Sequence, residues 1–308
     1  MNTRRLGKTG LFVSEIGFGG EWLERHPEEA GIELIRYAAS KGVNLLDCWM
    51  PDPKSRDIIG KGIHENRAHW IIQGHVGSTW KDGQYFRTRD MRYVKPAFED
   101  LLRRMQTDYI DLMLIHWPDV NTDFAETADA LNALKKSGKV LHIGVSNFTR
   151  EQMEEIGQYC TLEAYQPQYS MVVRTNEEQM KWAAEQGMGV MTYGSLGGGI
   201  LTGAFRKLTT FEATDSRNRF YKHFQEPMFS KVMKVLEVMD RISADRDNVP
   251  LSQIALNWCA QKEFVSSCIV GAQSRRKIEE NCAAYQWMLT SEEIALLDAA
   301  IEQYLVEQ

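Results

Sequence analysis

The stretch "RDMRYVKPAFEDLLRRMQTDYIDLMLIHW", residues 89–117, contains the repeating unit on which the fold prediction rests. Residues 89–105 place apolar side chains at the spacing of an amphipathic helix. Residues 110–117 then form a continuous apolar run, which is typical of a parallel strand buried on both faces. A helix followed by such a strand is the unit of a parallel α/β fold.

The same alternation extends in both directions along the chain. Seven more apolar runs have the character of buried strands: 15–19, 44–48, 70–76, 140–147, 163–170, 189–194 and 266–272. Eight strands alternating with helices predict an α/β fold, a closed (β/α)8 TIM barrel, formed by residues 1–308 as one domain. We expect an N-terminal hairpin over 4–13 at the barrel base, extra helices over 225–261, and a last helix beginning near Ser291.

The composition argues against several classes of protein. The formal net charge is −6, which disfavours nucleic acid and anionic membranes as partners. The N-terminal "MNTRRLGKTG" is not followed by an apolar segment, and no apolar stretch is long enough to span a bilayer. The five cysteines are scattered and form no C-x-x-C pair, as expected of reduced thiols. These features predict a cytoplasmic protein that acts on a small molecule.

Acidic and imidazole side chains follow the ends of successive predicted strands. Asp47 lies at the end of the second strand and Asp52 follows it, His75 lies at the end of the third, and His116 at the end of the fourth. In (β/α)8 barrels the carboxyl ends of the strands meet at one mouth, which holds the active site. We therefore expect these four side chains to face one substrate as catalytic residues.

Five stretches together resemble the aldo-keto reductase superfamily over nearly the whole chain. They are "RRLGKTGLFVSEIGFGG", "LLRRMQTDYIDLMLIHWPD", "ALKKSGKVLHIGVSNF", "YGSLGGGILTG" and "GAQSRRKIEEN". The resemblance implies a nicotinamide cofactor, usually NADPH, lying across the barrel mouth. On the family's pattern, Ser146, Asn147 and Gln166 would hold the carboxamide, and Tyr193 would stack under the nicotinamide ring.

The resemblance also implies positions for the rest of NADP(H). The loop over the pyrophosphate would contain Gly194, Ser195, Leu196 and Gly199, and the adenosine end would contact Gly271, Gln273, Ser274, Lys277, Glu280 and Asn281. Glycine-rich turns let backbone N–H groups approach phosphate, whatever the family. Arg275, Arg276 and Lys277 put positive charge at a predicted helix start, which suits a 2′-phosphate. A solvated helix face is the alternative interpretation of that triplet.

The catalytic positions depart from the family's pattern. Members use an aspartate, a tyrosine, a lysine and a histidine, with the tyrosine as proton donor. Asp47 and His116 match two of these, whereas Asp52 stands at the tyrosine position and His75 at the lysine position. Pro53 also replaces the usual glycine. Both changes together indicate altered chemistry rather than simple loss.

Four interpretations of this cluster remain open. In the first, His75 or His116 carries the proton, Asp47 orients an imidazole, and Asp52 binds substrate hydroxyls. In the second, the two histidines and two carboxylates bind a divalent metal. A redox-neutral epimerase or lyase with bound NADP is the third. The fourth is an inactive NADP(H)-binding sensor or partner protein, since a fold does not fix a function.

Four tryptophans lie on or just after predicted strand ends. They are Trp22, Trp49, Trp80 and Trp117, with Trp80 inside the predicted loop 78–90. Packing of loops against the barrel is the plain interpretation, and a substrate pocket is the functional one. Indole faces beside carboxylates suit a polyhydroxylated ring. The sequence therefore predicts a small, sugar-like substrate.

Overall fold

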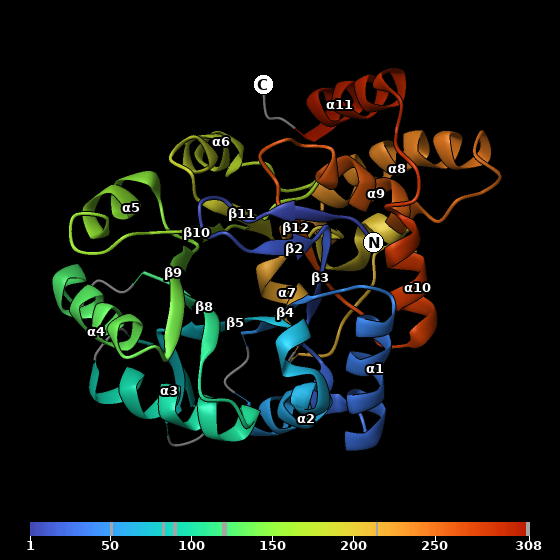
Figure 1. Ribbon diagram of the computed structural model, residues 1–308. Coiled ribbons are helices and arrows are strands. Elements are labelled where there is room, and N and C mark those ends of the chain that lie inside the picture. The colour runs from blue at the N-terminus through green and yellow to red at the C-terminus, as the bar shows by residue number, and fades with distance from the viewer. Residues whose placement is uncertain (50–51, 82–83, 89–90, 119–121, 214, 306–308) are drawn as a thin grey trace.

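Eight parallel strands close into a barrel in this computed structural model, which describes residues 1–49, 52–81, 84–88, 91–118, 122–213 and 215–305. The barrel strands are β3 (Ile16–Gly19), β4 (Leu45–Cys48), β5 (Ile71–Val76), β8 (Ile110–Ile115), β9 (Val140–Ser146), β10 (Ala164–Gln166), β11 (Gly189–Thr192) and β12 (Ser267–Gly271). The last strand, β12, pairs with the first, β3, and so closes the barrel (Figure 1). The predicted (β/α)8 architecture is confirmed, with each strand at its predicted run.

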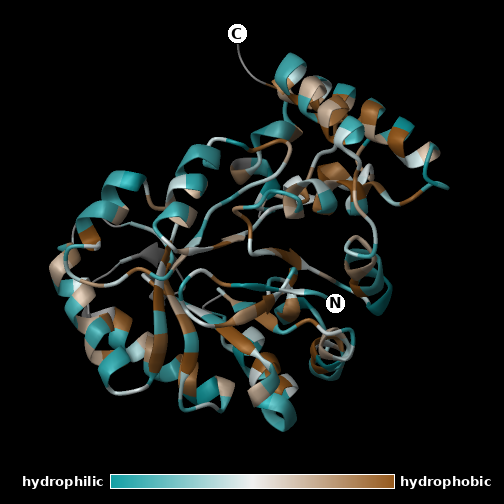
Figure 2. Ribbon diagram, turned by 45° about the horizontal axis from the view of Figure 1, so that its top comes forward, coloured by the Kyte–Doolittle hydropathy of each residue, from teal (hydrophilic) through white to brown (hydrophobic). Residues whose placement is uncertain are grey.

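Helices surround this barrel. They are α1 (Glu28–Ser40), α2 (Pro53–Ile63), α3 (Met91–Met105), α4 (Phe124–Lys136), α5 (Arg150–Ile156), α6 (Glu177–Glu185), α8 (Met228–Ala244), α9 (Leu251–Ala260), α10 (Arg275–Ala283) and α11 (Ser291–Leu305). Figure 2 shows brown, apolar barrel strands and helices with much teal, polar surface. The extra helices expected over 225–261 are α8 and α9. Within the described residues, no helix is both long enough and apolar enough to cross a membrane.

The N-terminal hairpin lies across the base of the barrel, as predicted. It consists of β1 (Thr3–Arg5) and β2 (Phe12–Ser14), which cross the barrel in Figure 1. Leu6 and Val13 are fully buried in one apolar cluster with barrel residues such as Leu45. Gly7 has φ +51°, and a Cβ there would lie 2.3 Å from the backbone nitrogen of Gly189. A side chain at residue 7 would therefore push the hairpin off the barrel base.

Alternate residues along each strand face the barrel interior, and their polarity changes towards the mouth. The apolar cluster contains Leu45, Ile71, Leu112, Leu114, Ala164, Met191 and Ile269. Two residues further along these strands come Asp47, Gln73, His116, Gln166 and Tyr193. The interior is therefore apolar near the base and polar near the carboxyl ends of the strands.

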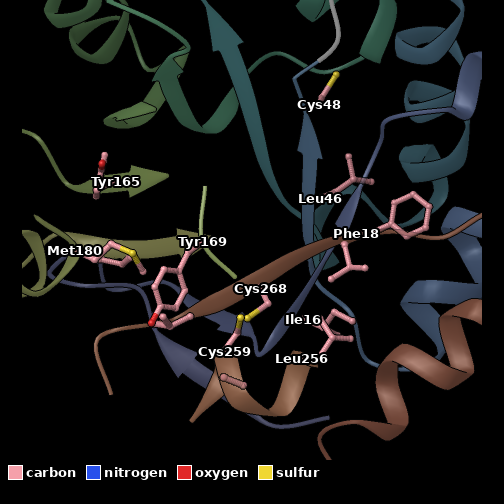
Figure 3. Close-up of a cluster of buried hydrophobic side chains, with 14 of the residues drawn as sticks. Ile16, Phe18, Leu46, Cys48, Tyr165, Tyr169, Met180, Leu256, Cys259 and Cys268 are labelled. Carbon is pink, nitrogen blue, oxygen red and sulfur yellow. The ribbon is translucent and has the colours of Figure 1, made fainter. Parts of the chain in front are cut away.

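A second apolar layer separates the strands from the helices. Figure 3 shows part of it, with Phe18 and Leu46 from the strands and Leu256 from α9. The thiols of Cys259 and Cys268 lie side by side in the same view, and both residues are fully buried. The described cysteines are all free thiols, as the sequence predicted.

The predicted loop at 78–90 was wrong in part. Residues Ser78–Lys81 form strand β6 and Gln84–Arg87 form strand β7, and the two pair antiparallel. Thr79, Trp80, Tyr85 and Phe86 are residues that favour strands, but the many polar neighbours hid that signal. The hairpin lies between β5 and α3, so it follows the strand that carries His75.

Short helical turns occupy the remaining connections. They are η1 (Leu23–Arg25), η2 (His64–His69), η3 (Gly197–Thr202), α7 (Arg217–Phe220) and η4 (Lys222–Phe224). The long connection after β11 contains the last three. Its Tyr221 and Phe224 lie against Gly198, where a Cβ would come within about 3 Å of both rings.

Candidate active site

Asp47 and His75 meet at the mouth, at the ends of two neighbouring strands. Asp47 stands in β4 and is paired in register with Gln73 of β5, two residues before His75. The Nε2 atom of His75 lies 3.0 Å from Oδ1 of Asp47. Both residues are buried, with 3% of Asp47 and 5% of His75 exposed. The position that holds lysine in the family's pattern is thus filled by an imidazole that contacts the same aspartate.

The other ring nitrogen of His75 has no hydrogen-bond partner among the described residues. Its Nδ1 atom is buried. The His116 ring lies next to it, with centroids 5.0 Å apart and planes at 89°. His75 therefore has one ring nitrogen held by a carboxylate and one that is buried without a partner among the described residues. The structure thus places Asp47, His75 and His116 together at the mouth, and their catalytic role stays a prediction.

Asp52 has a structural task that the sequence prediction did not include. It is the N-cap of α2, and its Oδ1 accepts a hydrogen bond from the backbone N–H of Ser55 at 2.9 Å. Pro53 at the first helical position is likewise usual for a helix start. The predicted contact of Asp52 with substrate stays a prediction, because one of its oxygens already caps the helix.

The residues expected around a nicotinamide carboxamide form one hydrogen-bonded network. The Ser146 hydroxyl donates to the Gln166 backbone carbonyl at 2.8 Å, and Asn147 Nδ2 donates to the Ser146 hydroxyl at 2.9 Å. Tyr193 Oη donates to Asn147 Oδ1 at 2.7 Å. The network reaches the acid through Gln166 Nε2, 3.4 Å from Asp47 Oδ2.

The predicted pyrophosphate loop is held open by glycines. Gly194 and Gly199 have φ of +69° and +97°, and Gly197 and Gly198, which the sequence prediction omitted, have +58° and +64°. Left-handed turns of this kind let backbone N–H groups approach an anion, although those of Gly197 and Gly199 donate within the loop, to the carbonyls of Gly194 and Leu196 at 2.8 and 3.0 Å. Ser195 is buried, and its hydroxyl lies 3.2 Å from that of Thr192. Leu196 is the residue that precedes η3.

An unpaired donor beside this loop supports a cofactor there. The side-chain nitrogen of Gln168 is buried and has no partner among the described residues. It would lie 3.5 Å from a Cβ built on Gly194. The open glycine backbone and this free donor both suit a phosphate or ribose oxygen, so the residues present fit a nicotinamide dinucleotide.

The predicted adenosine end gathers at the start of α10. Ser274 is the N-cap, and its hydroxyl accepts from the Lys277 backbone N–H at 3.3 Å. Gly271 ends β12, Gln273 is exposed, and Asn281 is buried. Lys277 donates to both oxygens of Glu280 at 3.0 Å, and Glu280 also accepts from the Ser252 hydroxyl at 2.5 Å.

The basic triplet is partly neutralised within the chain. Arg275 pairs with Glu33 and lies over the Tyr37 ring, with its guanidinium carbon 4.9 Å from the centroid. Lys277 pairs with Glu280. Arg276 is exposed and has no ion-pair partner in the described part of the chain. The positive charge that would meet a 2′-phosphate is therefore centred on Arg276.

Two of the four predicted substrate tryptophans lie at the paired histidines. The rings of Trp49 and His116 are 5.3 Å apart, and those of His116 and Trp117 are 5.8 Å apart. Trp22 is held further along the first strand end in a left-handed conformation, with Arg25 stacked 3.5 Å above its ring. Trp80 lies in β6, and its side chain is outside the described part of the structure.

Glu21 is a candidate that the sequence prediction passed over. It follows Gly20, whose N–H donates to the backbone carbonyl of Asp47 at 2.9 Å. Burial, with the nearby carboxylates of Glu24 and Asp47, raises the pKa of Glu21 to about 7. The positive charge of Arg25 lowers this pKa, and the negative charge of Asp215 raises it further. A carboxyl that titrates near neutral pH at a barrel mouth is a candidate proton-transfer group.

The metal interpretation finds no support in this arrangement. Across the described residues, no three histidine, cysteine, aspartate or glutamate side chains converge closely enough to hold a metal ion. The site combines a carboxylate–imidazole pair, a second imidazole and a titratable carboxyl beside a network of amides. That chemistry suits proton transfer.

Comparison with known proteins agrees with this geometry. The aldo/keto reductase family model matches residues 15–302. The chain is 31% identical to aldo-keto reductase YhdN of Bacillus subtilis (strain 168), over 98% of this chain and 94% of that protein. It is 27% identical to the NADH-specific methylglyoxal reductase of Escherichia coli (strain K12), over 95% and 94%. The fold matches the glycerol dehydrogenase AKR11B4 from Gluconobacter oxydans with TM-score 0.89 and 28% identity, over 99% and 96%. The chain therefore belongs to the aldo/keto reductase family and is an oxidoreductase of the kind that uses a nicotinamide cofactor.

Proposed function

We propose that this enzyme uses NADP(H) to interconvert a hydroxyl and a carbonyl group on a small, sugar-like substrate, with Asp47 and His75 managing the proton. The observation that carries the proposal is the 3.0 Å contact between Asp47 Oδ1 and His75 Nε2, together with the unpaired Nδ1 of the same ring. The bound cofactor supplies or accepts the hydride. The chain's own groups then have to supply or accept one proton.

The imidazole of His75 is suited to that proton. A carboxylate at one ring nitrogen fixes the tautomer, so that the other nitrogen can act as a base. In the oxidising direction, Nδ1 of His75 takes the proton of the substrate hydroxyl. In the reducing direction it returns a proton to the carbonyl oxygen. His116 lies 5.0 Å away, centroid to centroid, and contributes a second polar ring beside the reacting oxygen.

The choice of NADP(H) rests on the start of α10. Arg276 is exposed there without an acidic partner in the described residues, and Lys277 lies one residue further on. Guanidinium and ammonium groups near a helix N-terminus favour a phosphate. Ser146, Asn147, Gln166 and Tyr193 would hold the nicotinamide end.

A polyol or small hydroxy-carbonyl compound fits the mouth best. Trp49 and Trp117 flank His116 and offer ring faces to C–H groups. Asp47, Glu21 and Asp52 would provide acceptors for hydroxyls. The similarity to a glycerol dehydrogenase and to a methylglyoxal reductase supports a small oxygenated substrate.

The test begins with cofactor binding measured by calorimetry for NADPH and NADH, followed by a panel of polyols and aldoses assayed for NADPH formation. We expect NADPH to bind more tightly. We expect His75→Gln to lower turnover by about 10²-fold or more, while the Kd for NADPH stays unchanged. Turnover that survives in His75→Gln would reject the proton role of this ring.

A redox-neutral reaction is the second candidate. Two histidines, His75 and His116, and two carboxylates, Asp47 and Asp52, are more acid–base groups than a simple reduction needs. A substrate deuterated at the reacting carbon separates the two. Net transfer of label to free NADPD supports the dehydrogenase. Return of the label to an altered sugar supports epimerisation or elimination with retained cofactor. Binding of NADPH with no turnover of any kind would support the interpretation as an inactive NADP(H)-binding sensor or partner protein.

A further inference from the structure

Gln73 is a buried amide in the wall of the barrel, immediately below the proposed reacting groups. It lies on β5 between Ile71, which belongs to the apolar interior cluster, and His75. The residue is 0% exposed. A buried amide is costly unless it is hydrogen-bonded, so its partners indicate why it is there.

The amide nitrogen of Gln73 contacts both members of the acid–imidazole pair. Its Nε2 lies 2.9 Å from Asp47 Oδ1 and 2.9 Å from His75 Nε2, and these two atoms are 3.0 Å apart. The amide nitrogen, and not the amide oxygen, must face Asp47, because two acceptor oxygens at this distance would repel. Three atoms thus form a nearly equilateral triangle, in which not every contact can be a straight hydrogen bond.

Counting hydrogens decides which contacts are bonds. Three nearly equal sides place Asp47 Oδ1 and His75 Nε2 about 60° apart as seen from the Gln73 nitrogen. The two N–H bonds of a planar amide diverge by about 120°, so the amide serves only one of these atoms well. Hydrogen bonds to a carboxylate are stronger than those to a neutral ring. Gln73 and His75 Nε2 therefore both donate to Asp47 Oδ1.

We infer that Gln73 is a positioning residue: its amide holds the Asp47 carboxylate where it accepts a hydrogen bond from the Nε2–H of His75, so that Nδ1 is the nitrogen left to exchange a proton with substrate. The proton exchange between Nδ1 and substrate rests on the proposed function, whereas the tautomer of His75 does not. Among the described residues, the remaining oxygen of Asp47 has only the 3.4 Å contact with Gln166 Nε2. Without Gln73, the carboxylate would lose one of its two short side-chain contacts.

The test reads the tautomer directly. Nitrogen-15 NMR of histidine-labelled protein distinguishes a protonated from an unprotonated ring nitrogen, and loss of a signal in His75→Gln assigns the ring. At a pH where this ring is neutral, we expect the wild type to show protonated Nε2 and bare Nδ1. Gln73→Met keeps the length of the side chain and removes the donor. We expect it to give a mixture of tautomers and to lower kcat by about 10-fold or more, with KM little changed.

Gln253→Met is the matched control. Gln253 is also buried, and its amide oxygen accepts from Trp287 Nε1 at 3.0 Å, away from the mouth. That change should cost comparable stability and leave the His75 signals in place. A wild-type ring protonated at Nδ1, or an unchanged ring in Gln73→Met, would overturn the inference. If the tautomer responds as expected but His75→Gln keeps full turnover, the positioning stands and the proposed function fails.

Discussion

The two halves of the barrel mouth differ in how completely their polar atoms are paired. At the predicted nicotinamide end of the cofactor half, Ser146, Asn147 and Tyr193 bond to one another and to the Gln166 backbone, and the unpaired Gln168 nitrogen lies apart from them, beside the glycine-rich loop. On the catalytic half, His75 Nδ1 and Gln73 Oε1 are buried without partners in the described residues. In the sequence resemblance, the predicted cofactor residues follow the family's pattern, whereas the predicted catalytic residues depart from it at Asp52 and His75.

This difference indicates where a ligand is needed to complete the structure. A buried unpaired polar atom costs roughly 1–3 kcal/mol, so a protein keeps one where another molecule supplies the partner. The paired half acts as a preformed support. The unpaired half is where we propose that substrate chemistry occurs. Substitutions at four residues test this contrast.

The largest effect is expected from Asp47→Asn. The substitution keeps the shape of the side chain but removes the charge that holds His75 Nε2 at 3.0 Å. Turnover should fall by about 10²-fold or more, the usual scale for loss of a positioned proton-transfer group. The Kd for NADPH should stay within about twofold, because the acid meets the cofactor half only through the 3.4 Å contact with Gln166. Steady-state kinetics measures turnover, and calorimetry measures the Kd for NADPH. Near-normal turnover in Asp47→Asn would contradict a catalytic role for this half of the mouth.

Glu21→Gln should change the pH dependence of stability. The folded pKa of Glu21 is raised to about 7 from an ordinary value of 4.5, so the folded protein holds a proton that the unfolded chain releases. Its contribution is fully present below about pH 4.5 and is lost as the pH rises through 7. Wild type therefore carries a cost above pH 8, on the order of 1–3 kcal/mol.

Denaturation at several pH values measures this. The Glu21→Gln variant should be more stable than wild type at pH 8, and the difference should disappear near pH 4.5. Glu263→Gln, at an exposed position, should show no such trend. A constant difference across the pH range would mean that Glu21 titrates normally and belongs to the solvated surface.

A smaller effect is expected from Tyr193→Phe on the paired half. The change removes the hydroxyl that donates to Asn147 Oδ1 at 2.7 Å and keeps the ring for stacking. One hydrogen bond contributes about 0.5–1.5 kcal/mol, so the Kd for NADPH should rise by about 2- to 10-fold. Fluorescence titration measures it, with Tyr159→Phe on the exposed surface as the control. If turnover falls more than affinity for NADPH, Tyr193 takes part in the reaction as well, and its assignment to the cofactor half alone is wrong.

The smallest effect on stability is expected at Asp52. Asp52→Ala removes the N-cap of α2 and should cost about 1 kcal/mol, whereas Asp52→Asn keeps a good cap and should cost little. Thermal unfolding gives both values. Asp52→Asn also isolates the charge: a fall in kcat/KM at unchanged Tm supports the predicted substrate contact. Unchanged kinetics would assign Asp52 to the helix start alone.

The barrel was predictable because its signal is local. Runs such as 110–117 are apolar throughout, and burial on both faces requires that composition. The β6–β7 hairpin was missed because alternating polar residues hid its strand character. The positions of Asp47, His75 and His116 could be predicted too, because parallel strand ends must converge on the mouth.

Gln73 and Glu21 could not be identified in the same way. Gln73 lies inside a strand, and only its contacts with residues of β4 and β5 distinguish it from a packing residue. The pKa of Glu21 depends on burial and on Asp215, which is nearly two hundred residues away along the chain. Both depend on how distant segments meet, and one sequence does not contain that information in a local pattern.

The hairpin at the base has a consequence for the timing of proton exchange with water. Leu6 and Val13 are fully buried against Leu45 and its apolar neighbours, beneath the polar groups of the mouth. In the described residues, this leaves no chain of polar side chains from His75 down to the base. On the proposed function, we therefore expect a proton taken up at the mouth to leave by the side on which substrate enters, and its exchange with bulk water to wait for release of the product.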